Sequence, residues 1–292
     1  MSAGARGTTI ARAKVNLSLR VAGRRPDGYH ELESLVVFAD AGDGLTAHAS
    51  ADLSLDVTGP FAGALAGEAD NLVLRAARAL QTEAATDKGA RLALDKRLPV
   101  ASGIGGGSAD AAAALRLTNE LWGAGLDERA LARVALGLGA DVPVCLAPEP
   151  AFMTGIGERI ERLSLPDFAL LLVNPGVEVP TGEVFRRLAA PELSGEGVAA
   201  EIPSFASLDG LLAWLCEHAN DLEMPARDIA PVINEVLDAL EGLPGQLVAR
   251  MSGSGATCFA MFRTLDEAHD AARALSEAHR GWWCAAAPVV TG

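Results

Sequence analysis

The sequence predicts an α+β protein with two domains and a boundary near residues 150–165. Both halves of the chain mix short apolar runs of strand length with longer segments of helical periodicity. Half of the 292 residues are hydrophobic, which suffices for one large core or two ordinary ones. Periodicity shows two mixed halves and leaves the topology of each half open.

The first strand is expected at residues 8–21, where apolar and polar residues alternate. A period of two is typical of a strand with one face in the core. The apolar face holds Val15, Leu17, Leu19 and Val21, and the polar face holds Lys14, Asn16, Ser18 and Arg20. We therefore expect a half-buried strand with a polar, cationic face.

The rest of the first half is organised around a glycine-rich turn. Strands are expected at 34–38, 53–57 and 92–94, and helices at 71–81 and, after the glycines of 103–107, at about 108–122. Asp127 is a good N-cap for the next helix. A short apolar strand is expected directly after Asp141.

The second half continues with strands and helices in a different order. Strands are expected at 168–173, 246–251, 257–262 and 282–290, and helices near 181–189, 207–218, 226–241 and 264–278. Thr264 and Glu267 stand in capping-box register at the start of the last helix. Residues 191–206 contain Pro, Gly and Ser without a motif, and are expected to form a loop.

The charge of the chain disfavours one class of partner. Its 38 Asp and Glu against 24 Lys and Arg give a formal net charge of −14. A broad nucleic-acid surface is therefore not expected, because phosphate contacts need clustered cations. The first 26 residues carry cations and no acid, so positive charge is concentrated around Lys14.

The apolar runs and the cysteines indicate a compartment. The best apolar run, FALLLV at 168–173, is far shorter than a membrane span, and the start lacks the apolar core of a secretory signal. The four cysteines are far apart and form no C-x-x-C pair, which argues against a structural zinc site. We expect a cytoplasmic protein without a membrane partner.

Residues 98–112, LPVASGIGGGSADAA, are the strongest local signal for a ligand. Glycine lets an anion approach the main chain, and the N–H groups at the start of a helix favour phosphate. Ser108 is placed to cap the helix that follows. No Gly-Lys-Ser/Thr follows, and no third glycine completes G-x-G-x-x-G, so a P-loop and a dinucleotide-binding dehydrogenase are both disfavoured. The alternative is a flexible turn ahead of a helix.

Five motifs in order connect the chain with a known family: ARAKVN at 11–16, DGYHE at 27–31, the glycine segment at 98–112, GADVPV at 139–144 and SGSGA at 252–256. With them the sequence resembles the GHMP small-molecule kinases from about residue 8 to residue 262. The resemblance implies a two-domain fold, with a mixed-sheet, ATP-binding N-terminal domain at 1–158. It implies a ferredoxin-like, substrate-binding C-terminal domain at 159–292, and leaves open whether the last strand returns to the first domain.

The combination of these motifs resembles one branch of the family in particular. It implies ATP-dependent phosphorylation of the 2-hydroxyl of 4-diphosphocytidyl-2-C-methyl-D-erythritol, giving the 2-phosphate and ADP in non-mevalonate isoprenoid (terpenoid) biosynthesis. The implied cofactors are ATP and Mg²⁺, and the implied partner is a small molecule that carries cytidine diphosphate. Monomer and weak homodimer both stay open.

The resemblance assigns the catalytic roles to Lys14 and Asp141. Asp141 would take the proton of the acceptor hydroxyl, and the neighbouring Lys14 would keep that carboxylate ionised and stabilise the transferred charge. Which of the two dominates deprotonation stays open. Taken singly, they would be a solvated strand lysine and a turn aspartate.

The resemblance also assigns a nucleotide site. Its residues are Asn71, Leu72, Lys96, Pro99, Ser102, Gly103, Gly105, Gly106, Gly107 and Ser108, of which Asn71 and Leu72 would recognise adenine. On its own, Asn71 is an N-cap and Lys96 a surface strand residue. Ser108 is also a candidate ligand of the Mg²⁺ that must accompany the ATP phosphates. No carboxylate cluster identifies the metal site from the sequence.

The substrate residues implied by the resemblance are Asn16, Tyr29, His30, Thr181 and Phe185. Tyr29 and Phe185 would supply aromatic faces for cytosine, and His30 a polar contact. The third glycine motif, Gly253, Ser254 and Gly255, would form a tight turn near the phosphate loop or the substrate. The alternatives are an inward-packed Phe185 and an ordinary hairpin turn at 252–256.

Two other functions compete with the cytidyl-substrate kinase. A GHMP kinase for homoserine, mevalonate or a sugar would share the glycine loop, but would not need DGYH together with Phe185. A GHMP-fold binding protein that has lost catalysis would need neither Lys14 nor Asp141, so both residues argue against it.

Overall fold

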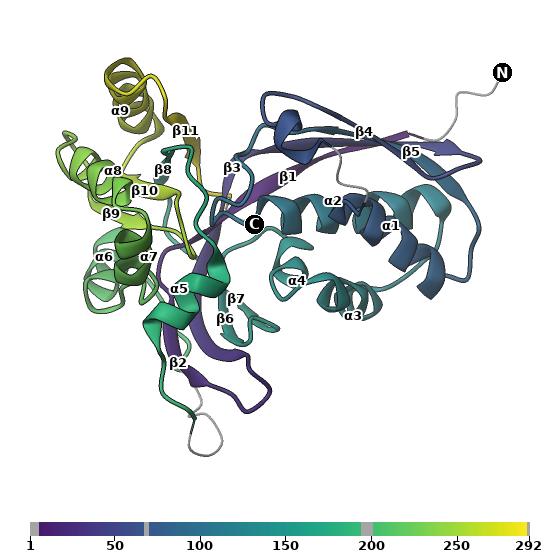
Figure 1. Cartoon of the computed structure of the whole chain (residues 1–292), viewed down its shortest axis with the longest axis horizontal. Helices are drawn as coiled ribbons and strands as arrows, with labels where there is room; N and C mark the ends of the chain where they lie inside the picture. The colour runs from purple at the N-terminus through teal and green to yellow at the C-terminus, as the bar shows by residue number, and fades with distance from the viewer. Residues whose placement is uncertain (1–5, 67–69, 194–200, 291–292) are drawn as a thin grey trace. The chain divides into compact units, whose positions relative to one another are not determined.

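The computed structural model describes residues 6–66, 70–193 and 201–290 of the chain (Figure 1). These form two compact units, each built from separate chain segments. The first unit contains residues 1–13, 42–100 and 105–147, and the second contains 14–41, 101–104 and 148–292. The two units are therefore discontinuous in sequence, and the family's division at 158/159 stays a prediction. Part of the expected loop 191–206, residues 194–200, lies outside the described residues.

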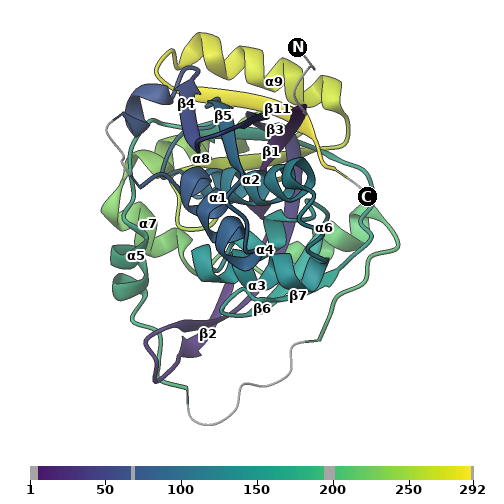
Figure 2. The same cartoon turned by 90° about the vertical axis from the view of Figure 1, so that its right-hand side faces the viewer.

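The first unit is a small sheet covered by helices. Its strands are the start of β1 (Arg6–Asn16), the second half of β3 (His30–Ser50), β4 (Ser54–Thr58) and β5 (Gly89–Asp95). Its helices are η1 (Ala62–Leu65), α1 (Leu72–Glu83), α2 (Gly106–Trp122), α3 (Glu128–Leu138) and α4 (Val142–Cys145). β5 pairs antiparallel with β3 and parallel with β4. Figures 1 and 2 show α1 and α2 side by side against this sheet.

The second unit contains two groups of strands. The first half of β3 pairs antiparallel with β2 (Arg20–Arg24) and with β6 (Ala151–Gly155), which pairs with β7 (Arg159–Arg162). The second group is β8 (Ala169–Asn174), β9 (Val248–Met251), β10 (Cys258–Phe262) and β11 (Trp283–Pro288). The helices are α5 (Thr181–Leu188), α6 (Leu208–Glu217), α7 (Glu223–Ile229), α8 (Val232–Glu241) and α9 (Leu265–Ala278).

The four strands β8–β11 confirm the ferredoxin-like prediction. They lie in the order β11-β8-β10-β9, and each neighbouring pair is antiparallel. α8 packs on β9 and β10, and α9 packs on β8, β10 and β11 (Figure 1). Alternate residues of β8 and β10, such as Leu171 and Ala260, face these helices in a continuous buried core. After β11, Val289 forms a bridge with Ala39 of β3, so the end of the chain also contacts the long strand.

The predicted strand 8–21 is wrong in two respects. β1 ends at Asn16 and β2 begins only at Arg20, because the backbone N–H groups of Leu17 and Leu19 bond to Leu35 and Ala219. The polar face is buried, with Lys14 3% and Asn16 4% exposed. Arg20 does not continue that face. Its guanidinium is exposed and pairs with Glu33 at 2.9 Å.

Three other predicted boundaries need correction. The residues after Asp141 form the helix α4 instead of a strand, and Pro143 fits its first turn, where proline needs no N–H partner. The predicted helix 226–241 is two helices, α7 and α8, because Ala230 and Pro231 interrupt it. α2 begins at Gly106, with Gly105 as its N-cap, so the prediction that Ser108 caps it is wrong.

Three other helices begin where the capping residues in the sequence predict. Asn71 caps α1 and Asp127 caps α3, each through a side-chain oxygen that accepts a backbone N–H. Thr264 and Glu267 form the predicted capping box of α9.

Candidate active site

The glycine segment turns sharply before α2. Ala101, Gly103 and Gly105 have φ of 50°, 77° and 62°, a region that favours glycine. Gly105 thereby ends the turn as the N-cap of α2, and Gly106 and Gly107 form its first turn without side chains. The first N–H groups of a helix have no partner within it, so this end of α2 suits an anion.

Lys96 lies directly beneath that first turn. Its Nζ is 3.3 Å from the position a Cβ of Gly106 would take. The ammonium donates to Asp43 Oδ2 and to Asp110 Oδ2, both at 2.6 Å, and all three side chains are buried. Asp43 Oδ1 in turn accepts from the backbone N–H groups of Arg97 and Leu98. Lys96 is therefore no surface lysine, and its direct contact with a nucleotide stays a prediction.

Asp110 is the least satisfied member of this cluster. Its Oδ1 is buried and has no hydrogen-bond partner among the described residues. Burial, together with the nearby Asp43 carboxylate, raises the pKa of Asp110 to about 7, although the Lys96 ammonium acts in the opposite direction. The two carboxylates raise the pKa of Lys96, although burial alone would lower it. A proton on Asp110 makes the cluster neutral, whereas its loss leaves one net negative charge.

The start of α1 lies next to the start of α2. Asn71 is buried and its Oδ1 accepts from Val73 N at 2.9 Å, as an N-cap does. The Cδ1 atom of Leu72 is 3.5 Å from the position that a Cβ of Gly107 would take. The structure thus brings the predicted adenine residues close to the predicted phosphate loop, within the first unit.

In the second unit, three segments far apart in sequence meet. Lys14 N donates to Ile104 O at 2.9 Å, and Asn16 N donates to the Ser252 hydroxyl at 3.1 Å. The Ser252 hydroxyl donates to Gly103 O at 3.0 Å. A Cβ on Gly103 would lie 2.5 Å from Ser252 O, so this glycine is required for the approach. Backbone groups and the Ser252 hydroxyl thus connect the end of β1, the glycine segment and the third glycine motif in one hydrogen-bond network.

The third glycine motif also carries a side-chain contact to α5. Gly253 and Gly255 have φ of 56° and 84°, which allows the tight turn between β9 and β10. Ser254 lies in that turn, and its hydroxyl group is 2.8 Å from the hydroxyl group of Thr181, the first residue of α5.

The side chain of Asn16 is held by a neighbouring strand residue. Asn16 donates from its Nδ2 to the buried Ser34 hydroxyl at 2.8 Å, which fixes the orientation of the amide.

The predicted cytosine residues lie in the β2–β3 turn and in α5, and two of them, His30 and Phe185, are in contact. Tyr29 N donates to the Asp27 carboxylate, and Arg25 N donates to Tyr29 O, which closes a tight turn. The Tyr29 side chain is 56% exposed. His30 opens β3, and its ring stacks on Phe185 with centroids 4.5 Å apart. Burial, and to a lesser extent the charge of Arg24, lowers the pKa of His30, so the imidazole is neutral near pH 7.

The two predicted catalytic residues belong to different units. Lys14 is buried in β1 as part of the second unit, and Asp141 is the partly buried N-cap of α4 in the first. Their pairing stays a prediction. Pro99 and Ser102 are also buried, in the segment that leads to Gly103.

Some supporting residues escaped the sequence analysis. Asn220 donates from its Nδ2 to Met251 O at 2.9 Å and to Gly253 O at 2.8 Å, which holds the third glycine motif in place. Arg116 of α2 donates to the end of α4. The one local signal for Asn220 is its position shortly before the start of α7. No local signal marked Arg116.

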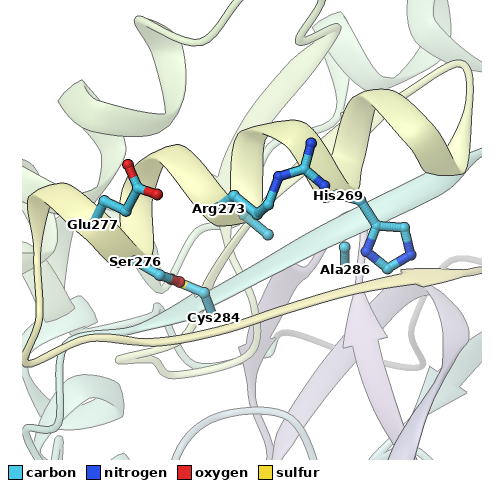
Figure 3. Close-up of a pocket in the computed structure, with 7 residues that line it drawn as sticks. His269, Arg273, Ser276, Glu277, Cys284 and Ala286 are labelled. Carbon is cyan, nitrogen blue, oxygen red and sulfur yellow. The ribbon is translucent and has the colours of Figure 1, made fainter.

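A surface pocket lies elsewhere, between α9 and β11 (Figure 3). His269, Arg273 and Glu277 line it from the helix, and Cys284 from the strand. The pocket includes none of the predicted site residues.

Among the described residues, no group of three or more His, Cys, Asp or Glu could hold a metal ion. None of the helices within residues 6–66, 70–193 and 201–290 is long and apolar enough to cross a membrane.

Comparison with known proteins decides the family. Residues 71–148 match the GHMP kinases N terminal domain, and residues 199–281 match the GHMP kinases C terminal domain. A 4-diphosphocytidyl-2-C-methyl-D-erythritol kinase of Parvibaculum lavamentivorans is 55% identical over 94% of this chain and 96% of its own. The chain belongs to the 4-diphosphocytidyl-2-C-methyl-D-erythritol kinase family of GHMP kinases.

Further similar proteins support the family, and one supports the fold alone. A Cereibacter sphaeroides kinase of the same name is 52% identical over 94% of this chain and 96% of its own. A crystal structure of a 4-(cytidine 5'-diphospho)-2C-methyl-D-erythritol kinase matches 98% of this chain and 100% of its own, with a TM-score of 0.77 and 35% identity. A homoserine kinase from Cytophaga hutchinsonii, at 19% identity and a TM-score of 0.70, covers 99% of both chains and shares the fold.

Proposed function

We propose that this kinase transfers the γ-phosphoryl group of MgATP to the 2-hydroxyl of 4-diphosphocytidyl-2-C-methyl-D-erythritol. The observation that carries the choice of substrate is the stack of His30 on Phe185, with an exposed tyrosine, Tyr29, directly before His30 in the chain. Aromatic faces and a neutral imidazole suit a cytosine ring, which stacks and hydrogen-bonds at its edge. Relatives that are more than half identical over nearly the whole chain carry the name of this kinase.

In the proposed reaction, the acceptor oxygen attacks the γ-phosphorus while the bond from that phosphorus to the ADP oxygen breaks. The hydroxyl proton passes to the Asp141 carboxylate, and the Lys14 ammonium stabilises the charge on the acceptor and the transferred group. The glycine segment and the start of α2 bind the nucleotide phosphates. The products are ADP and the 2-phosphate, which places the enzyme in non-mevalonate isoprenoid biosynthesis.

Mg²⁺ enters the proposed reaction as part of the nucleotide substrate. Mg²⁺ usually keeps several water ligands and binds through substrate phosphates and one or two protein side chains. Ser108, the third residue of α2, is the candidate protein ligand.

A coupled assay tests the proposed substrate. ADP release is measured with MgATP and, in turn, 4-diphosphocytidyl-2-C-methyl-D-erythritol, mevalonate, homoserine and galactose. Release with only the first supports the proposal. Release with another alcohol assigns a different GHMP kinase activity, and release with none supports a binding protein.

We also propose a cytoplasmic location and a monomer or weak homodimer. The four cysteines of the chain are unpaired thiols, which suits a reducing compartment. Fractionation of cells and sedimentation at several protein concentrations test the two points separately.

A further inference from the structure

Arg116 holds the carboxyl end of α4. Its Nη1 donates to Cys145 O at 2.8 Å and to Leu146 O at 3.1 Å. Cys145 is the last residue of α4, and Leu146 is its C-cap. The last carbonyl groups of a helix have no partner within the helix, and a cation there is favourable. The guanidinium therefore satisfies two carbonyl groups that a four-residue helix cannot satisfy itself.

α4 is short, buried and attached directly to Asp141. All four of its residues, Val142 to Cys145, are buried, and the helix packs against α2 and α3 (Figure 1). Asp141 is its N-cap, and Val142 N donates to Gly139 O at 3.1 Å. A helix with so few internal hydrogen bonds is positioned by its neighbours. A shift at its carboxyl end therefore moves the residue at its start.

The surroundings of Arg116 strengthen its two hydrogen bonds. The side chain is partly buried on α2, and burial lowers the pKa of Arg116, with Cys145 acting against that effect and Arg12 adding to it. An arginine stays charged under such conditions, and charge-assisted hydrogen bonds are stronger than neutral ones. Arg116 stands ten residues after Gly106, so the helix that begins at the glycine segment also fixes α4.

We propose that Arg116 is a positioning residue for Asp141. This rests on the proposed function, in which Asp141 accepts the hydroxyl proton. Because a displacement of about 1 Å at a reacting group can cost about 100-fold in rate, loosening α4 lowers turnover without removing a nucleotide contact. The whole arrangement lies within the first unit.

The test compares Arg116→Ala with Arg129→Ala, a change at an exposed arginine of α3. For Arg116→Ala we expect kcat to fall by about 10- to 100-fold, with KM for ATP changed less than threefold. Added guanidinium at millimolar concentration is expected to restore part of kcat in this variant, and to leave wild type and Arg129→Ala unchanged. A purely structural role would lower the folded fraction and would not respond to guanidinium.

A double-mutant cycle tests whether Arg116 acts through Asp141. In an Asp141→Asn background, Arg116→Ala is expected to change kcat less than threefold. Additive losses, or a wild-type kcat in folded Arg116→Ala, overturn the proposal. If the alanine variant does not fold, Arg116→Met keeps most of the stem without a donor, and a wild-type kcat in that variant overturns the proposal equally. Wild type inactive on all four alcohols would instead refute the proposed function.

Discussion

The imidazole ring of His30 stacks on the phenyl ring of Phe185, with 4.5 Å between centroids and 26° between planes. The stack joins the first residue of β3 to α5, two segments more than 150 residues apart within the second unit. It orients the imidazole without using either ring nitrogen. The stack leaves the nitrogens at the edge of the His30 ring, where a polar ligand can bind, and Tyr29, the preceding residue, has an exposed side chain.

The first prediction concerns the aromatic faces. Tyr29→Ala and Phe185→Ala are each expected to raise KM for the cytidyl substrate by about 5- to 100-fold, because a base stacked on an aromatic ring gains about 1–3 kcal/mol. KM for ATP is expected to stay within twofold. Phe205→Ala, which removes an aromatic ring that contacts Trp214, is the matched control. Equal effects of the three variants on the cytidyl substrate would show that the rings only support the fold.

The second prediction concerns the charge of His30. Since burial and the charge of Arg24 lower its pKa from 6.5, the imidazole is largely neutral at pH 7.5 and above, and KM for the cytidyl substrate is expected to be constant from pH 7.5 to 8.5. Below the lowered pKa the ring gains a proton, and KM is expected to rise. NMR titration of the ring protons measures the pKa directly. A midpoint above 6.5 contradicts the prediction, and His30→Gln identifies the resonance.

The third prediction concerns stability and the Lys96 cluster. Asp110 has a pKa of about 7 in the folded protein, against 3.8 as its ordinary value, so between these pH values only the folded state holds the proton. Stability therefore falls as pH rises through this range, by about 1.4 kcal/mol per unit for one proton. Between pH 5 and 7, wild type is expected to lose about 2–3 kcal/mol more than Asp110→Asn.

Urea unfolding at several pH values measures this difference. Glu120→Gln, a change at an exposed carboxylate on the same helix, is expected to follow the wild-type curve. Parallel curves for wild type and Asp110→Asn from pH 5 to 7 would show that Asp110 is ionised in the folded protein throughout.

The sequence predicts what depends on local signals and fails where distant contacts decide. Asn71, Asp127 and Thr264 were sufficient to place three helix starts, because an N-cap acts within its own turn. The apolar residues after Asp141 fit a strand or a helix equally by periodicity, and burial against α2 and α3 decided for the helix α4.

The chemistry of the site shows the same limit. Lys14, Lys96 and their surroundings have the alternating pattern of half-exposed strands, yet both lysines are buried. For Lys96 the reason is a contact that is distant in sequence. Its ammonium donates a hydrogen bond to Asp43, which is 53 residues away. The hydrogen bond from the backbone N–H of Asn16 to the hydroxyl of Ser252 spans 236 residues. Motifs identified these residues, but only the fold shows which of them support others.

The last prediction concerns the proposed base. Asp141→Asn keeps the size of the side chain and its place before α4, but the amide cannot accept the hydroxyl proton. Turnover is expected to fall by about 10²- to 10⁴-fold, while the dissociation constant for ATP stays within about twofold, because the glycine segment and α2 are unchanged. Asp127→Asn, which preserves an N-cap on α3, is the matched control and is expected to retain wild-type kcat. Single-turnover measurements with saturating MgATP separate the chemical step from product release. If Asp141→Asn transfers the phosphoryl group at the wild-type rate in that experiment, another group accepts the proton, and the role assigned to Asp141 is wrong.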